Sequence, residues 1–217
     1  LIIGIIILDI SFFFQIWSIW RRKHSHGLSL TAWSINFIGR VIWVVYGMLL
    51  STDGGIVLTV GQGLCGLMSI PIIYYIIRNR NTNGEYIKNN FNNKLFVARV
   101  VSVAMLFILI VVSTCLGAFA VKGNYKQASG TTILIISIIG SAFTGLSFLP
   151  QTIRTIRTRN TKSTSLYLCI AFIIGNVLMI SYLLFGVVTI SVEKYISGVI
   201  FTTISVISMS LIAIIKI

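Results

Sequence analysis

The chain has 217 residues, of which 56% are hydrophobic and only 10% charged, and its mean hydropathy is +0.98. A soluble domain carries about 25% charged residues, so this composition excludes an ordinary water-soluble enzyme and a disordered chain. Lys and Arg outnumber Asp and Glu by 17 to 4, which gives a formal net charge of +13. The 3 cysteines lie inside apolar runs, which predicts small buried side chains and no disulfide framework or metal site.

Apolar runs long enough to cross a bilayer, which takes about 20 helical residues, follow one another along the chain. Polar, basic or turn residues bound each run, so we expect one compact integral membrane domain. In chain order the runs cover about residues 1–20, 28–50, 55–77, 95–120, 131–153, 164–188 and 191–217. The first run has neither the basic start nor the small-residue cleavage site of a signal peptide, and we expect it to be a true span.

The basic residues predict the orientation of these spans. If the N-terminus is outside, 13 Lys and Arg residues fall on the inner side, 3 fall outside, and Arg40 lies within a span. Because cytoplasmic segments close to membrane spans carry an excess of Lys and Arg, we expect the N-terminus outside and the C-terminus in the cytoplasm. The positive charge then reflects topology, and we expect no nucleic-acid partner.

The chain repeats itself with an offset of 136 residues. Residues 12–46 and 148–182 align without gaps, and 9 of the 35 positions are identical. The identical pairs are Phe12/Phe148, Gln15/Gln151, Arg21/Arg157, Ser29/Ser165, Leu30/Leu166, Ile38/Ile174, Gly39/Gly175, Val41/Val177 and Tyr46/Tyr182. Apolar matches arise easily between membrane spans, but matches of Gln, Arg, Gly and Tyr do not, so we interpret the pattern as a duplication.

Each copy contains three spans, and the odd run between the copies restores the orientation for the second copy. The two copies are therefore expected to be parallel repeats, related by an axis along the membrane normal. We expect an all-α membrane protein with seven transmembrane helices. Its parts are a first three-helix repeat at 1–78, an inner loop and linker helix at 79–130, and a second three-helix repeat at 131–217.

A short motif in the second copy resembles a known family. Residues 149–186 contain Pro150 and Gln151, a basic turn, and the sequence Lys-Ser-Thr-Ser-Leu at 162–166, and they are similar to a PQ-loop motif. The first copy is similar through Gln15, its Arg-Arg-Lys turn and the Gly-Leu-Ser at 27–29.

The organisation of three, one and three spans resembles SWEET and cystinosin-like transporters, and bacterial SemiSWEETs are a single three-helix copy. This resemblance implies a membrane transporter and no enzyme. Phe14 stands where the first copy would carry the proline, so the hinge of that copy departs from the motif. We therefore expect the chain to be kinked near Pro150 and to run straighter past Phe14.

Polar side chains inside the spans indicate a candidate site near the midplane. Trp33, Asn36 and Arg40 share one helix face through their spacing of three and four residues. Asn176 aligns with Arg40 in the second copy, and Gln62 stands near the position of an asparagine found in many sugar-transporting relatives. We expect these five residues to bind the solute.

Asp9 and Arg40 are predicted at similar depth, which suggests an ion pair. The pair is interpreted either as part of solute binding or coupling, or as a contact that only holds helices together. Gln15, Pro150 and Gln151 are candidates for a hinge or gate, with ordinary polar helix caps as the alternative.

The expected function is transport of a small polar solute, with a sugar as the first choice. An amino-acid carrier, with or without proton coupling, is the alternative. A non-transporting membrane protein similar to lipid-A-associated or trafficking-receptor relatives is a third reading, of a different class. We expect the lipid bilayer and a small molecule as partners, no cofactor, and no metal at His24 and His26, because three basic residues precede them. Homo-oligomerisation is left open.

Overall fold

The computed structural model describes residues 1–22, 25, 28–49, 53–79, 87–121, 129–161, 164–189 and 192–217. Within them the chain is helical. The helices are α1 (Ile2–Arg22), α2 (Leu30–Leu49), α3 (Asp53–Arg78), α4 (Ile87–Val121), α5 (Gly130–Leu146), α6 (Leu149–Thr158), α7 (Leu166–Thr189) and α8 (Val192–Lys216).

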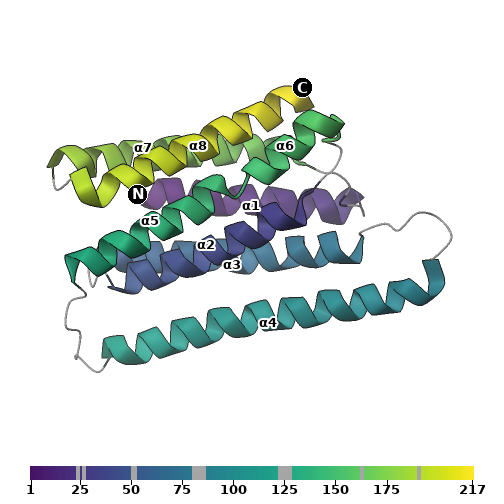
Figure 1. Ribbon diagram of the computed structural model, residues 1–217, viewed down its shortest axis with the longest axis horizontal. Helices are drawn as coiled ribbons and strands as arrows, with labels where there is room; N and C mark the ends of the chain where they lie inside the picture. Colours follow the sequence, from purple (N-terminus) through teal and green to yellow (C-terminus); the bar gives the residue numbers. More distant parts are fainter. Residues whose placement is uncertain are drawn as a thin grey trace.

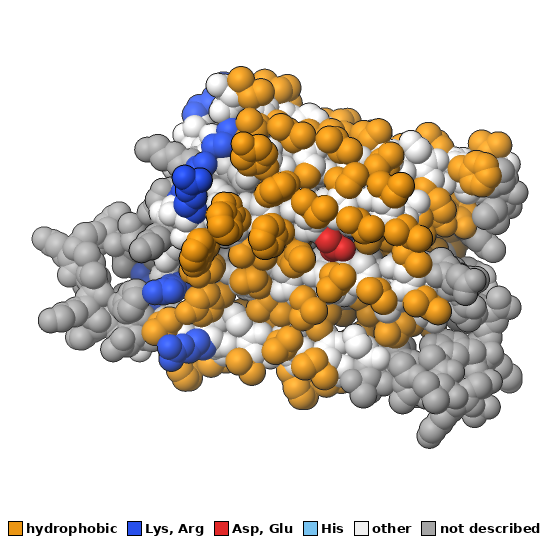
Figure 2. Space-filling model, turned by 180° about the vertical axis from the view of Figure 1, so that it is seen from behind, with side chains coloured by type: hydrophobic (Ala, Val, Ile, Leu, Met, Phe, Trp, Pro, Cys, Tyr) orange, Lys and Arg blue, Asp and Glu red, His pale blue; other side chains and the backbone are white. Residues whose placement is uncertain are grey.

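Seven segments of the described chain are long and apolar enough to cross a membrane, with α5 and α6 together forming one of them over 130–158. This confirms the predicted fold class, an all-α multi-pass membrane protein with seven spanning helices. Apolar side chains cover the middle of the surface, and basic side chains gather at one end (Figure 2). We call this the basic end; α1, α3, α6 and α8 finish there, and it carries Arg21, Arg22, Arg78, Arg154, Arg157, Arg159 and Lys216.

Six helices form a closed ring whose order in space differs from their order in the chain. In the first repeat α3 packs against both α1 and α2, and in the second α8 packs against both α5 and α7. The repeats meet through α1 against α7 and α2 against α5. The order around the ring is therefore α1, α3, α2, α5, α8, α7, and α4 lies outside it against α3 and α2 (Figure 1).

Two glycines at matched repeat positions bring the repeats close together. A Cβ atom on Gly39 of α2 would lie 2.7 Å from Cγ2 of Thr144 on α5. A Cβ atom on Gly175 of α7 would lie 2.9 Å from Cγ of Leu8 on α1. Both seams between the repeats thus depend on the missing side chain, since real Cβ atoms almost never approach a neighbour within 3.0 Å.

The two equivalent first spans of the repeats differ in one respect. α5 ends at Leu146 and α6 begins at Leu149, so the helix breaks just before Pro150 (Figure 1). Pro150 lies in the first turn of α6, where its missing N–H costs no helical hydrogen bond. α1 runs unbroken past Phe14. The unequal bend expected from the two sequences is confirmed.

Candidate functional site

A cavity lies at the centre of the ring, with a volume of about 40 Å³ open to water-sized molecules. All six ring helices contribute to its lining. The lining residues are Leu8, Arg40, Trp43, Gln62, Thr144, Gly145, Phe172, Asn176, Met179, Thr202 and Ser205. One water needs about 10–15 Å³ by this measure, so this conformation has room for a few waters, and a hexose requires the cavity to widen.

The cavity lies on the pseudo-twofold axis between the repeats. Arg40 of α2 and its repeat equivalent Asn176 of α7 both line it, as do Leu8 of α1 and its equivalent Thr144 of α5. The alignment predicted that Arg40 and Asn176 approach one cavity, and the structure brings them there together with Gln62. Their part in binding a solute stays a prediction.

Arg40 is buried at the centre of the ring, with only 4% of its surface exposed. Its Nη1 donates a hydrogen bond to Oε1 of Gln62 on α3, and its Nε donates to Oδ1 of Asn36 over 3.4 Å. Its guanidinium carbon lies 5.3 Å from the centre of the Phe12 ring, at cation–π distance. Each of these partners is neutral.

Asn36 is not among the cavity-lining residues, but it is hydrogen-bonded to Arg40, which is. While its Oδ1 accepts from Arg40, its Nδ2 donates to Oγ of Ser147 over 3.1 Å. Ser147 lies at the break between α5 and α6, so this bond joins the repeats. Asn176 is tied to its own helix instead, because its Nδ2 donates to the carbonyl oxygen of Phe172 over 2.7 Å.

The expected ion pair between Asp9 and Arg40 is not formed. Asp9 is half-buried and outside the cavity lining, and its Oδ1 accepts a hydrogen bond from Sγ of Cys65 over 2.9 Å. An ion pair between Asp9 and Arg40 would require α1 and α2 to be neighbours, whereas α3 lies between these helices. Two residues one helical turn apart on α3 bind the two charges separately: Gln62 is hydrogen-bonded to Arg40, and Cys65 to Asp9.

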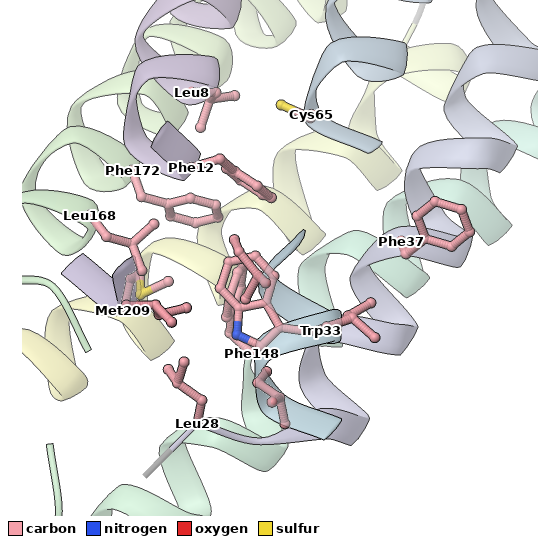
Figure 3. Packing of buried hydrophobic residues seen from close by; sticks show 14 of the residues in the cluster. Leu8, Phe12, Leu28, Trp33, Phe37, Cys65, Phe148, Leu168, Phe172 and Met209 are labelled. Carbon is pink, nitrogen blue, oxygen red and sulfur yellow. The ribbon is translucent and has the colours of Figure 1, made fainter. Parts of the chain in front are cut away.

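An aromatic cluster closes the cavity toward the basic end. Trp33 is buried within it and packs edge-on against Phe12, with ring centres 5.3 Å apart, and against Phe148, 5.9 Å apart. Phe148 in turn packs against Phe172 at 4.9 Å. Figure 3 shows these four side chains meeting between the helices. Trp33, expected to bind solute, is thus a member of this cluster and not of the cavity lining.

Beyond the aromatic cluster, two glutamine side chains cross between the repeats in matched fashion. Oε1 of Gln15 accepts a hydrogen bond from the backbone N–H of Ser165 over 3.0 Å. Oε1 of Gln151 accepts one from the backbone N–H of Ser29. Ser29 and Ser165 immediately precede α2 and α7, and all four residues are buried. We call this pair of contacts the reciprocal glutamine contacts.

This closure includes four residues that were not predicted as site residues: Ser29, Ser165, Phe12 and Phe148. A signal for them was present, because all four belong to the nine identical pairs of the internal repeat. Identity between copies marks positions where both halves need the same contact. The cavity residues Trp43, Thr144, Thr202 and Ser205 gave no such signal.

One further contact at the basic end occurs in only one half. Nη1 of Arg154 on α6 donates to the carbonyl oxygen of Leu28 over 2.6 Å. The equivalent positions in the other half are Ser18 and Thr164, whose buried hydroxyl groups find no hydrogen-bond partner in the described part of the chain.

The described residues contain no group of three or more His, Cys, Asp or Glu side chains that could hold a metal ion. Cys65 and Cys169 are free and buried. His24, His26 and Cys115 lie outside the residues whose side chains the structure describes.

Two parallel helical repeats, closed into a ring around a central cavity, define a multi-pass membrane protein built by duplication. The chain belongs to the PQ-loop repeat family: the family profile, described as PQ loop repeat, matches residues 1–55 and 132–192, more than half of the chain. The chain is also similar to the sugar transporter SemiSWEET of Escherichia coli (strain UMEA 3162-1), with 43% identity over 51 residues. That alignment covers 24% of this chain and 57% of the relative. The resemblance inferred from the sequence motifs is confirmed.

Proposed function

We propose that the protein moves a small polar solute across the membrane by alternating access, with the two three-helix repeats rocking about the central cavity. The observation that carries this proposal is the lining of the cavity by every helix of the ring. A small change in the angle between the repeats would therefore alter the cavity from all sides. A site near the midplane, between repeats that rock against each other, is common among secondary transporters.

The basic end supplies the gate in this scheme. The conformation described here is closed at that end by the aromatic cluster and the reciprocal glutamine contacts. Opening it separates Gln15 from Ser165 and Gln151 from Ser29 while the repeats tilt apart. The break before Pro150 gives the first span of the second repeat a place to bend, whereas the equivalent helix α1 is unbroken.

We propose that the basic end faces the cytoplasm, as the distribution of Lys and Arg predicts. Single cysteines introduced beside Arg22 and Arg157 are then labelled by a membrane-impermeant reagent only after the membrane of intact cells is opened. A cysteine at Ser129, which lies at the opposite end of the chain's spans, is labelled in intact cells and serves as the control. Labelling of the positions beside Arg22 and Arg157 in intact cells would contradict the proposed orientation and place the basic end outside.

For the solute, a sugar is the first choice because the similar protein SemiSWEET is a sugar transporter. An amino acid is the second choice, and the buried guanidinium of Arg40 favours it over a solute without charge. The third reading, a non-transporting membrane protein, predicts that neither class of solute moves.

Uptake into proteoliposomes tests the proposal. Purified protein is reconstituted, and uptake of labelled sugars and amino acids is followed with and without a pH gradient, with protein-free vesicles as the control. Saturable sugar uptake supports the first choice. Uptake of amino acids alone supports the second, and an increase with an imposed gradient adds proton coupling. A folded, reconstituted protein that moves neither class contradicts both choices of solute.

A further inference from the structure

The described lining of the cavity has one charged side chain, Arg40, and no acidic one. Asp9 is the only acidic residue whose side chain the structure describes, and it lies at the seam between α1 and α3, bonded to Cys65. A buried positive charge near the middle of a membrane is costly unless something neutralises it. In the described structure Arg40 therefore has no direct ion-pair partner, and the charge of Asp9 acts on it only from across the seam.

Arg40 also retains unused hydrogen-bonding capacity. A guanidinium has five N–H donors in a planar fork, and the structure shows Arg40 using one on Nε and one on Nη1. The other three, including both on Nη2, donate to no atom of the described residues. Only 4% of the surface of Arg40 is exposed, yet the residue borders the cavity. These N–H groups are therefore available to a molecule that enters the cavity.

We infer that the solute carries a carboxylate, and that Arg40 binds it; this inference rests on the proposed function, in which the cavity holds the transported solute. A carboxylate offers two oxygens in the plane of the guanidinium fork, so it can accept two parallel hydrogen bonds and neutralise the charge at once. A neutral sugar can accept hydrogen bonds from Arg40 but leaves its charge without a direct ion-pair partner.

The remainder of the lining favours hydroxyl groups on the solute over an ammonium group. Thr202 and Ser205 of α8 place hydroxyls on the cavity, and Gln62 and Asn176 place amides there. These groups can donate to and accept from hydroxyls. An ammonium group would also require an anionic partner, and the described lining offers none. The solute class is therefore a hydroxy acid, such as a sugar acid, in preference to an amino acid or a neutral sugar.

Glycerol, glycerate and serine test this assignment because they share a three-carbon skeleton and differ only in charged groups. Binding to the purified wild-type protein is measured by calorimetry at low ionic strength, and glucose and glucuronate form a second pair of larger size. We expect each acid to bind at least about tenfold more tightly than its neutral partner, because hydrogen bonds to charged groups are the stronger ones. Glycerate is expected to bind more tightly than serine.

Two results in the wild type overturn the inference. If glycerol and glucose bind as tightly as their acids, the cavity does not select a carboxylate. If serine binds more tightly than glycerate, the cavity selects an amino acid and the hydroxy-acid assignment is wrong. Both results come from the wild-type protein, so they do not depend on whether an Arg40 variant folds.

Variants then locate the charge responsible. Arg40→Gln removes the cation, and the affinities for each acid and its neutral partner should then differ by no more than about twofold. Arg157→Gln removes the same charge from an exposed position at the basic end and should retain the full preference. Asp9→Asn removes the nearest described negative charge and should raise the preference several-fold. Retention of the full preference in Arg40→Gln, or a weaker preference in Asp9→Asn, would contradict the role of Arg40.

Counterflow in proteoliposomes separates this inference from the proposed function. Exchange of glucose without exchange of glucuronate or glycerate supports the proposed transport but contradicts the inference that the solute carries a carboxylate. Tight binding of glycerate by a reconstituted protein that exchanges none of these solutes leaves the carboxylate site standing and contradicts transport.

Discussion

The two repeats share a frame but differ in what they place on it. Their helices pack in the same order, with the third helix of each repeat between the other two, and matched glycines close both seams between them. The polar groups near the cavity are not matched. Asp9, Arg40, Gln62 and Cys65 of the first repeat correspond to Gly145, Asn176, Gly198 and Phe201 of the second. Packing is thus duplicated, while charge is concentrated in the first repeat.

The basic end shows the opposite behaviour. There Gln15 is repeated as Gln151, and the reciprocal glutamine contacts use these two residues in the same way. A closure formed by two halves meeting on an axis needs the same contact from each half. A cavity that binds one solute has no such need, because the solute itself is not symmetric. The comparison predicts that exchanging residues between the repeats is harmful in some layers and tolerated in others.

The largest effect is expected from giving the first repeat the proline of the second. Phe14→Pro places proline inside the unbroken α1, where it loses an N–H and clashes with the carbonyl of Ile10. We expect a loss of about 3 kcal/mol or more in the free energy of unfolding, measured by thermal melting in detergent. Pro150→Phe should cost less than about 1 kcal/mol, because the helix is already interrupted there.

Phe14→Leu is the matched control, since it changes the same side chain, including its contact with Tyr167, without altering the backbone. If Phe14→Pro melts at the same temperature as Phe14→Leu, α1 accepts a break as readily as the second repeat does. The unequal bend would then have no energetic basis.

A smaller but still clear effect is expected at the equivalent positions 9 and 145. A Cβ atom on Gly145 would lie 2.4 Å from the backbone oxygen of Phe201, so Gly145→Ala forces α5 and α8 apart. Overpacking of this kind costs about 1–3 kcal/mol. Asp9→Ala should leave melting unchanged or slightly raise it, because the thiol contact from Cys65 is weak and the carboxylate lies at an apolar surface. Equal losses at the two positions would show that the seams α1–α3 and α5–α8 are packed alike.

Much of this frame was predictable from the sequence. Bilayer thickness sets the length of each span, so apolar runs predict the spans directly, and the gapless repeat predicts two similar halves. Gly39 and Gly175 could be assigned to packing because a glycine retained in both copies of an apolar helix favours close approach. The proline rule predicted the break before Pro150 and its absence at Phe14.

The spatial order of the helices was not predictable from spacing along the chain. Nothing local in the sequence requires α3 to lie between α1 and α2, and this order separates Asp9 from Arg40. Helix periodicity correctly put Trp33 and Arg40 on one face, but it does not show where the aromatic cluster ends and the cavity begins. Those two positions differ by about two turns, or ~10 Å along α2.

A still smaller effect is expected from the reciprocal glutamine contacts, and it should be equal in the two halves. Gln15→Met and Gln151→Met keep the length of the side chain but remove the oxygen that accepts from Ser165 or Ser29. A buried N–H left without its acceptor costs about 1–3 kcal/mol, and opening the basic end relieves part of that cost. Each change should lower the melting temperature modestly and speed the labelling of a cysteine introduced beside Arg157.

Gln15→Glu and Gln151→Glu retain an acceptor oxygen and serve as controls for the methionine variants. A methionine variant that labels no faster than the wild type would remove that glutamine from the closure. A large difference between Gln15→Met and Gln151→Met would show that the two halves contribute unequally, in spite of their matched geometry.

The smallest effect is expected where the two halves differ at positions 18 and 154. Arg154 donates to the carbonyl of Leu28, but its side chain is exposed, so Arg154→Gln should cost at most about 1 kcal/mol, and less at high salt. Ser18→Ala removes a buried hydroxyl that has no partner among the described residues, and should leave stability unchanged or raise it by a few tenths of a kcal/mol. Melting temperatures of both variants at low and high salt make the comparison. Only Arg154 carries a charge. The difference in melting temperature between Arg154→Gln and the wild type should therefore shrink as the salt concentration rises, whereas the difference for Ser18→Ala should not change. A salt-dependent loss in Ser18→Ala would mean that its hydroxyl is bound to a charged group or an ordered water, and that the two halves are held at the basic end by more similar contacts than their sequences suggest.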